Sequence, residues 1–241
     1  MIPIRSMGRW IPRWLAAQYA FLLERYGASS FSTADAARDG VRKPEVVLPR
    51  LEKSGWVHRQ RRGVYTTADP TVAILCSFQK DWRLLVRQKE FVGMLESALA
   101  SLLSGFGGRL RGAVLFGSVA RGDARENSDM DILVVAEGVP ASYGERVREA
   151  VEMVGRVPTR AETEAKGAHH ELELVLLEPS ELREPYPFLL DVVNEGVLLY
   201  DYEGTTESKL NAIKKEFQSM GAVRSQLPDG SWYWVMETPL P

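Results

Sequence analysis

Cysteine is almost absent from this 241-residue sequence, which contains only Cys76. A single cysteine excludes a disulfide within the chain, and it also excludes a cysteine-rich zinc site. Histidine is scarce as well, and the three histidines include an adjacent pair, which is not the spacing of two ligands to one metal ion. A disulfide-stabilised fold and a cysteine-rich zinc protein are therefore both excluded.

Long apolar runs are missing too. No run reaches the roughly 18 to 20 residues that a membrane-spanning helix needs. The N-terminus contains Pro3, Arg5 and Pro12 but no apolar core of signal-peptide length. Apolar residues make up 45% of the chain and charged residues 26%, as is ordinary for a soluble globular protein. We therefore expect a soluble cytoplasmic protein that has no membrane partner.

Charge is distributed unevenly, although the net charge of the whole chain is only −2. Residues 1–67 hold twelve basic side chains against five acidic ones, about +7, and the remainder holds eighteen against twenty-seven, about −9. This division predicts two modules with different partners. The basic module either binds nucleic acid, where neutralisation of phosphates dominates affinity, or packs its basic face on the acidic half of the same protein.

Three helical patterns follow one another in the basic module. Apolar residues at helical spacing predict a helix over Arg13–Tyr26, ended by Gly27, and a second short helix over residues 32–37. A third helix is expected over Lys43–Lys53, and Pro49 is expected to kink or split it.

The next stretch, WVHRQRRGVYTT, predicts two short strands around a basic turn at Arg61–Gly63. Three short helices followed by a hairpin is the element order of a winged helix-turn-helix. The stretch Phe31–Thr67 also resembles winged-helix regulator domains through its pattern KP…L..LE..GWV.R…GVY. The predicted winged helix-turn-helix domain spans residues 1–69.

In winged-helix proteins the third helix enters the major groove and the wing touches the backbone or the minor groove. Carried over to this chain, the resemblance implies DNA or RNA binding by basic residues of the third helix and the hairpin: Arg42, Lys43, Arg50, Lys53, Arg59, Arg61 and Arg62. A domain that contacts only protein is the alternative.

The rest of the chain divides into three segments. Residues 70–104 are apolar and charged at helical spacing, which predicts connecting helices. Residues 105–203 form a second domain, entered through the glycine-rich break Gly105–Gly108, and residues 204–241 predict a helix and a hairpin with Pro228–Gly230 as its turn. Strands are expected over Gly112–Phe116, Asp129–Val135, Leu172–Leu177 and Val197–Tyr200, and helices over Tyr143–Gly155, Pro187–Asn194 and Ser208–Met220. The fold class is α+β (mixed α/β) with a mixed sheet.

A glycine-serine pair follows the first of these strands. At Gly117 the backbone can approach a phosphate without a side chain in the way, and a helix beginning there points free N–H groups at the anion. Ser118 can add a hydroxyl donor and Arg121, one turn on, a cation for the same phosphates. The alternative is that the serine only caps a helix after a tight turn.

Two aspartates begin the next strand. Asp129 and Asp131 are two residues apart, so their carboxylates project from the same face. Carboxylates held side by side at the edge of a core repel one another unless a cation lies between them, and magnesium prefers such hard oxygen ligands. Exposed turn residues are the alternative explanation.

The stretch GSVARGDARENSDMDILVV resembles the signature of the DNA-polymerase-β-like nucleotidyltransferase superfamily, a Gly-Ser followed at this distance by Asp-x-Asp. Its form is particularly similar to the minimal nucleotidyltransferase branch, found in prokaryotic toxin–antitoxin pairs and in antibiotic-modifying enzymes. The resemblance implies that Gly117 and Ser118 hold nucleotide phosphates and that Asp129 and Asp131 bind two Mg²⁺ ions. It also implies a third carboxylate on a later strand, either Glu173 or Glu171, with Glu173 preferred by position.

The activity implied is transfer of a nucleoside monophosphate from a nucleoside triphosphate, with ATP the usual donor, to a hydroxyl of RNA, protein or a small molecule. Two alternatives stay open. The chain is a DNA-binding regulator whose transferase-like domain senses nucleotide or a partner, or it is a toxin–antitoxin component with a protein partner. An intact set of Gly-Ser, Asp-x-Asp and Glu favours the enzyme.

Overall fold

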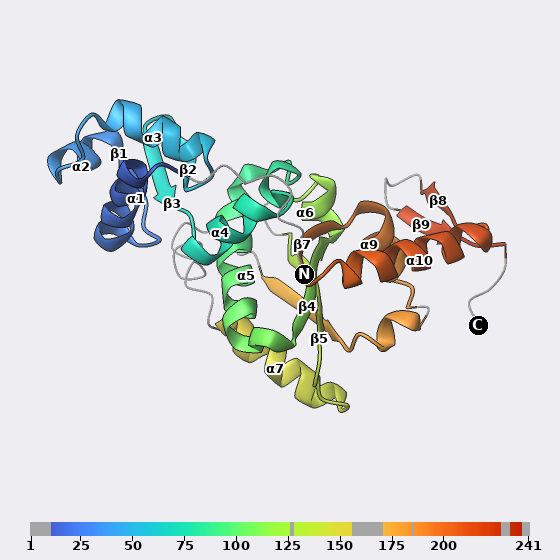
Figure 1. The fold of residues 1–241 in the computed structure, drawn as a ribbon. Coiled ribbons are helices and arrows are strands. Elements are labelled where there is room, and N and C mark those ends of the chain that lie inside the picture. The colour runs from blue at the N-terminus through green and yellow to red at the C-terminus, as the bar shows by residue number, and fades with distance from the viewer. Residues whose placement is uncertain (1–10, 126–127, 156–170, 185, 228–231, 238–241) are drawn as a thin grey trace. The chain divides into compact units, whose positions relative to one another are not determined.

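The computed structural model divides the chain into two compact units (Figure 1). The first takes in residues 89–101 and the described part of 1–85, and the second takes in 86–88 and most of the chain from 102 onward. Each unit is described by itself. The structure describes residues 11–125, 128–155, 171–184, 186–227 and 232–237.

The first unit begins with three helices and three short strands. The strands form an antiparallel sheet in the order β1-β3-β2, in which Phe31 pairs with Tyr65 and Val57 with Thr67. The elements are α1 (Arg13–Tyr26), β1 (Phe31–Ser32), α2 (Thr33–Arg38), α3 (Pro44–Lys53), β2 (Val57–Arg61) and β3 (Val64–Thr67). The three predicted helices and the predicted hairpin are therefore present, and β1 is an addition that the sequence did not predict.

Local sequence explains how the short helices begin. The hydroxyl of Ser32 accepts a hydrogen bond from the backbone N–H of Asp35, whose carboxylate accepts the N–H of Ser32, and together they form a capping box. Helix α3 starts at Pro44, where the missing N–H costs nothing. Of the kink or split predicted at Pro49, the split is wrong, because α3 continues through it. Pro49 and Glu45, whose carbonyl loses its donor, are both exposed, so water can replace the lost bond.

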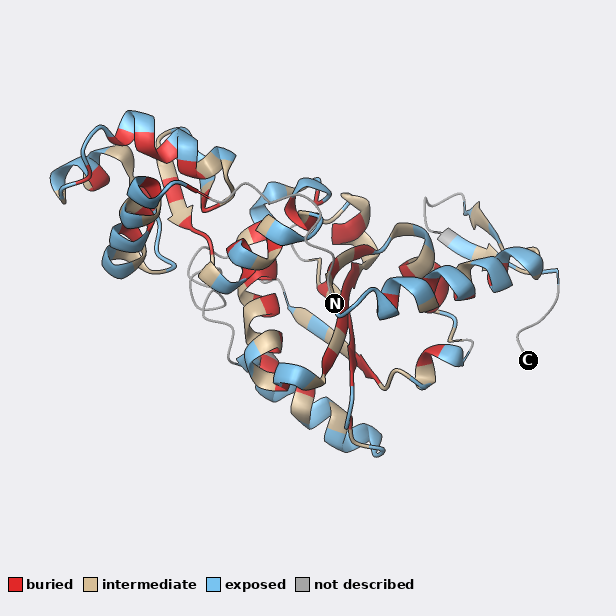
Figure 2. Cartoon of the chain, viewed as in Figure 1, coloured by how far each residue is buried: buried red, intermediate tan, exposed pale blue. Residues whose placement is uncertain are grey.

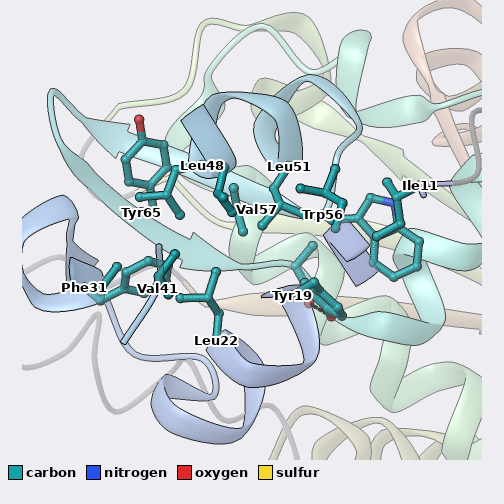
Figure 3. Packing of buried hydrophobic residues seen from close by; sticks show 14 of the residues in the cluster. Ile11, Tyr19, Leu22, Phe31, Val41, Leu48, Leu51, Trp56, Val57 and Tyr65 are labelled. Atoms are coloured by element: carbon teal, nitrogen blue, oxygen red, sulfur yellow. Dashed lines mark hydrogen bonds between the residues drawn. The ribbon is translucent and has the colours of Figure 1, made fainter. Parts of the chain in front are cut away.

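The core of these elements is shown in Figure 3, where apolar side chains of the helices converge on the hairpin. Leu22, Leu48 and Leu51 are fully buried, and Trp56 packs edge-on against Tyr19. The hydroxyl of Tyr19 also donates to the carbonyl of Ala68 at 2.7 Å.

Two longer helices follow, α4 (Pro70–Phe78) and α5 (Val92–Phe106), with short 3-10 turns between them. The helical stretch Lys89–Arg109 is long and apolar enough to cross a membrane by length and composition, contrary to our expectation from the sequence, and half of its most apolar window is buried inside the protein. Leu95 and Leu99 are among its fully buried side chains, as is usual for the core helix of a protein in water.

A buried ion cluster surrounds Glu96 of α5, which is only 2% exposed. Its carboxylate lies 3.0 Å from a guanidinium nitrogen of Arg83 and 2.8 Å from Nε2 of His58. Arg83 in turn pairs with Asp81 and donates to the carbonyl of Gly55. Charges buried in this way are stable only as a set.

The second unit contains a four-stranded sheet in the order β6-β5-β4-β7. Strands β4 and β5 are antiparallel, as are β4 and β7, whereas β5 and β6 run parallel, so the sheet is mixed as the sequence predicted. The strands are β4 (Leu110–Phe116), β5 (Met130–Ala136), β6 (Leu172–Leu177) and β7 (Val197–Asp201). Figure 2 shows that β4 and β5 are almost entirely buried.

Helices and a hairpin complete this unit. Helices α9 and α10 pack on the face of the sheet that carries Leu133 and Val135, and together they form one apolar core. The elements are α6 (Gly117–Arg121), α7 (Tyr143–Gly155), α9 (Leu189–Glu195), α10 (Thr205–Ser219), β8 (Val223–Gln226) and β9 (Trp232–Val235). Strands β8 and β9 pair antiparallel, and the predicted turn at Pro228–Gly230 lies outside the described residues.

Candidate nucleotide site

The backbone turns sharply between β4 and α6, at Gly117. Its φ is +73°, in the left-handed region that favours glycine, and a Cβ built there would overlap Oδ2 of Asp131. Phe116, just before it, is the register partner of Asp131 across the β4–β5 pair. The bare backbone of Gly117 and the first carboxylate of the site are therefore held against each other by the sheet itself.

On the side facing β6, Asp131 lies beside a second acidic residue, Glu173. In the parallel pair β5–β6 its register partner is Glu173, and paired residues project to the same face of a sheet. Asp129 lies just before β5 on that face, since side chains repeat every two residues along a strand. Asp129 and Asp131 are half-buried, and Glu173 is exposed. The structure thus brings the three predicted acidic residues to one end of two neighbouring strands.

The environment raises the pKa of Asp131 to about 6. Burial is the largest cause, and the negative charges of Glu173 and Asp129 add to it, while Arg121 acts in the opposite direction. An acidic group that resists ionisation because of burial and like charges is stabilised in its charged form by a nearby cation. This electrostatic situation is typical of functional sites.

Magnesium fits this donor set. In the described part of the chain, no group of three or more His, Cys, Asp or Glu side chains is close enough together to hold a metal ion on its own. Mg²⁺ usually takes only one or two carboxylates from the protein and completes its coordination with water and substrate phosphates. Asp129, Asp131 and Glu173 supply hard oxygen atoms, and Oδ2 of Asp131 lies where a side chain at position 117 would begin.

The two candidates for the third carboxylate have different surroundings. Glu173 lies inside β6 and faces Asp131 in register, and it is one of the charges that raise the pKa of that group. Glu171 lies before the strand, and its backbone carbonyl accepts the N–H of Met130 at 2.8 Å. These positions favour Glu173 as the third acidic residue, which stays a prediction.

Arg121, at the end of α6, is held by two acidic side chains. Its Nη1 donates to Glu195 at 2.5 Å, and its Nε donates to Asp123. Glu195 also accepts a hydrogen bond from Arg224 of β8 at 2.6 Å. The sequence analysis identified neither Glu195 nor Arg224, because no local pattern links residues so far apart in the chain.

The seven basic residues predicted to bind nucleic acid lie on α3, beside it, or on the hairpin of the first unit. All seven are exposed, and none has an ion pair with a carboxylate in the described residues. Arg50 lies over the ring of Trp14, at 5.5 Å from its centroid. By contrast, Arg25 and Arg38 pair with Asp39. These seven residues, which we call the basic face, are Arg42, Lys43, Arg50, Lys53, Arg59, Arg61 and Arg62.

Comparison with known proteins identifies one domain. Residues 97–193 match the model of the nucleotidyltransferase domain family. The chain is 28% identical over 129 residues to "Putative protein adenylyltransferase MJ1305" of Methanocaldococcus jannaschii. The match covers 53% of this chain and 83% of that protein. It is also 47% identical over 49 residues to "Putative protein adenylyltransferase MJ0604" of the same organism, and this match covers 20% of this chain and 42% of that protein.

A similar solved structure is that of a tri-AMPylated HEPN toxin of Shewanella oneidensis in complex with MNT antitoxin. The similarity covers 52% of this chain and 87% of the other, with 19% identity and a TM-score of 0.34.

Proposed function

The chain carries a nucleotidyltransferase domain over residues 97–193, and on that premise we propose that this enzyme transfers AMP from ATP to a hydroxyl group of a protein. The adenylyl donor and the protein acceptor are supported by the names of the two relatives from Methanocaldococcus jannaschii. RNA and small molecules are the other acceptors to be tested.

The observation that carries this proposal is the position of Gly117 against Asp131. Because position 117 is glycine, the carboxylate of Asp131 can lie directly against the turn, so a phosphate bound by the N–H groups of that turn also meets the carboxylate. Because a phosphate and a carboxylate repel each other, a cation must lie between them. The turn and the acidic residues are therefore parts of one site for a metal-bound triphosphate.

Each residue of the site has a role in the proposed reaction. Asp129, Asp131 and Glu173 would hold two Mg²⁺ ions, which when bound supply positive charge to the triphosphate and to the acceptor oxygen. Gly117 and Ser118 bind phosphate oxygens, and Arg121 stabilises the charge that develops during transfer. The acceptor oxygen forms a bond to the α-phosphorus as the bond to the bridging oxygen breaks and pyrophosphate leaves. We assign the uptake of the hydroxyl proton to Glu173, whose side chain is exposed.

The test is transfer of label from α-³²P nucleoside triphosphates, each offered separately with Mg²⁺. A soluble protein extract, total RNA and the purified enzyme alone serve as acceptors, and the Asp129→Ala/Asp131→Ala double variant is run in parallel. The proposal expects label from ATP on protein with the wild type only. Label on RNA would mean that RNA and not protein is the acceptor. Label from another nucleotide would mean that ATP is not the donor. Equal labelling by the double variant would refute the site.

A second function, nucleic-acid binding by the first unit, is favoured by the basic face. Seven exposed cations without carboxylate partners in the described residues are available to phosphates. Binding of duplex DNA and of RNA can be measured by gel shift with the wild type and the double aspartate variant. Binding that survives in that variant, together with the absence of transfer by the wild type, would support a nucleotide-sensing regulator instead of an enzyme.

A further inference from the structure

Glu195, the last residue of α9, links three elements of the second unit. Its Oε1 accepts a hydrogen bond from Arg121 of α6 at 2.5 Å, and its Oε2 accepts one from Arg224 of β8 at 2.6 Å. The side chain is only 11% exposed, so water screens these ion pairs poorly. One carboxylate therefore holds two guanidinium groups that come from opposite sides of it in the sequence.

The guanidinium of Arg121 has three nitrogen atoms, and two of them are engaged. Nη1 donates to Glu195 and Nε donates to Asp123, whereas Nη2 makes no hydrogen bond to any described residue. Asp123 is 55% exposed, so its pairing with Arg121 is weak, and Glu195 is the stronger anchor. The N–H groups of Nη2 are thus available as hydrogen-bond donors on a guanidinium that is otherwise fixed.

The location of this guanidinium matters because Arg121 acts on the site. Its helix, α6, begins directly after Phe116, the register partner of Asp131, so Arg121 lies on the element that adjoins the carboxylates. Arg121 lies one helical turn after Ser118, and its helix, α6, packs on β4, β5 and α9. A free arginine side chain samples many rotamers, and fixing it beforehand removes an entropic cost from phosphate binding.

We propose that Glu195 is a positioning residue for nucleotidyl transfer: its ion pair fixes the guanidinium of Arg121 so that the remaining N–H groups meet the triphosphate. This inference rests on the proposed function and adds to it a residue that does not touch the nucleotide itself. Arg224 bonds to the other carboxylate oxygen, Oε2, and connects the hairpin to α9, so the pair between Oε1 and Nη1 of Arg121 does not pass through it.

The experiment compares Glu195→Gln with Arg224→Met, since each removes one charge of the same cluster. Glu195→Gln keeps the shape of the side chain and loses the ion pair to Arg121. We expect kcat for AMP transfer to fall about 10- to 100-fold, as for a displaced catalytic group. Arg224→Met leaves the Arg121–Glu195 pair in place, so its kcat is expected within about threefold of the wild type. Equal losses in both variants would mean that Glu195 only anchors the hairpin, and would overturn the proposal.

A double-mutant cycle gives an independent decision. If Glu195 acts through Arg121, Glu195→Gln has no further effect on kcat in an Arg121→Met background. The same loss in both backgrounds would overturn the proposal. Thermal melting of all four proteins identifies any loss that follows unfolding.

ATP affinity, measured by isothermal titration calorimetry, separates this inference from the proposed function. If the wild type transfers no AMP, the proposed function fails, and the role of Glu195 is decided on binding alone. Weaker ATP binding by Glu195→Gln than by Arg224→Met would then support positioning, and equal binding would contradict it.

Discussion

Gly117 and Asp131 lie so close together that the smallest side chain at position 117 would overlap the carboxylate. The same glycine has a φ of +73°, which costs an L-residue free energy even without a clash. Two independent physical reasons, one steric and one conformational, therefore require glycine at this turn.

Gly117→Ala is expected to lower the free energy of unfolding by about 1–3 kcal/mol and to reduce transfer strongly, because strand β5 or the turn must shift. Gly144→Ala is the matched control. Gly144 lies in α7, and an added Cβ would meet nothing closer than 4.0 Å. Urea denaturation and label transfer measure the two effects. Equal stability and activity of the two variants would contradict the close approach of Gly117 to Asp131.

Asp131→Asn is expected to stabilise the metal-free protein at neutral pH while it abolishes transfer. The pKa of Asp131 is raised to about 6, so the folded state binds this proton more tightly than the unfolded state does. Its contribution to the free energy of unfolding is therefore present at low pH and is lost as the pH rises from about 4 through 6. At pH 7.5 the asparagine variant should be more stable by about 1 kcal/mol, a value reduced for a half-exposed group.

Urea denaturation in EDTA at about pH 4 and about pH 7.5 tests this linkage. The difference in unfolding free energy between variant and wild type should grow with pH. A difference that is constant, or that shrinks as the pH rises, would show that the like charges around Asp131 do not raise its pKa.

Glu173→Gln is expected to reduce the rate of transfer on the order of 100-fold, because the variant loses the carboxylate that takes up the hydroxyl proton. Glu171→Gln is the matched control, because that residue precedes β6 and has no register partner in the β5–β6 pair. Initial rates with saturating ATP measure both. A larger loss from Glu171→Gln than from Glu173→Gln would reverse the assignment of the third carboxylate.

The triple variant Arg59→Gln/Arg61→Gln/Arg62→Gln is expected to weaken DNA binding and to lower its salt dependence. Each lost phosphate contact reduces the slope of log K against log salt by about 0.9, so the slope should decrease by up to roughly 3. The double variant Arg25→Gln/Arg38→Gln is the control, because both arginines already pair with Asp39. Fluorescence anisotropy over a salt series gives the slopes, and identical slopes would exclude the hairpin from the interface.

Glu96→Ala is expected to lower the free energy of unfolding by about 3 kcal/mol, because it leaves the buried Arg83 and the partly buried His58 without their shared partner. Glu90→Ala, at an exposed position two residues before α5 begins at Val92, should change it by less than about 0.5 kcal/mol. Chemical denaturation decides between these expectations. A cost near zero for Glu96→Ala would mean that the cluster does not depend on its carboxylate.

Local signals predicted much of the fold. The helices Arg13–Tyr26 and Tyr143–Gly155 and the strand Leu172–Leu177 begin and end where apolar periodicity placed them, because each has a regular pattern and clear end signals. The split at Pro49 was wrong, since proline removes only one hydrogen bond and its partner there is exposed. The predicted break at Gly105–Gly108 marks the end of α5, which still includes Phe106.

Relationships across the sheet could not be predicted from local patterns. Glu171 and Glu173 share a strand face in the sequence, and only the register of β6 on β5 places Glu173 beside Asp131. The ion pair of Arg121 with Glu195 joins residues 74 positions apart in the chain. The ion pair of Arg224 with Glu195 forms only because the hairpin reaches α9. Such pairings follow from tertiary packing, which composition and periodicity do not encode.

The parallel pairing of β5 with β6 also determines when the site can be completed during synthesis of the chain. The antiparallel pair β4–β5 can form as soon as residues 110–136 have left the ribosome, whereas a parallel partner has to wait for a long crossover. Glu173 arrives later, and Glu195 and Arg224 later still. A nascent chain therefore holds Gly117, Asp129 and Asp131 before Glu173 and Glu195 are present, and transferase activity should appear only after residue 195 has been synthesised.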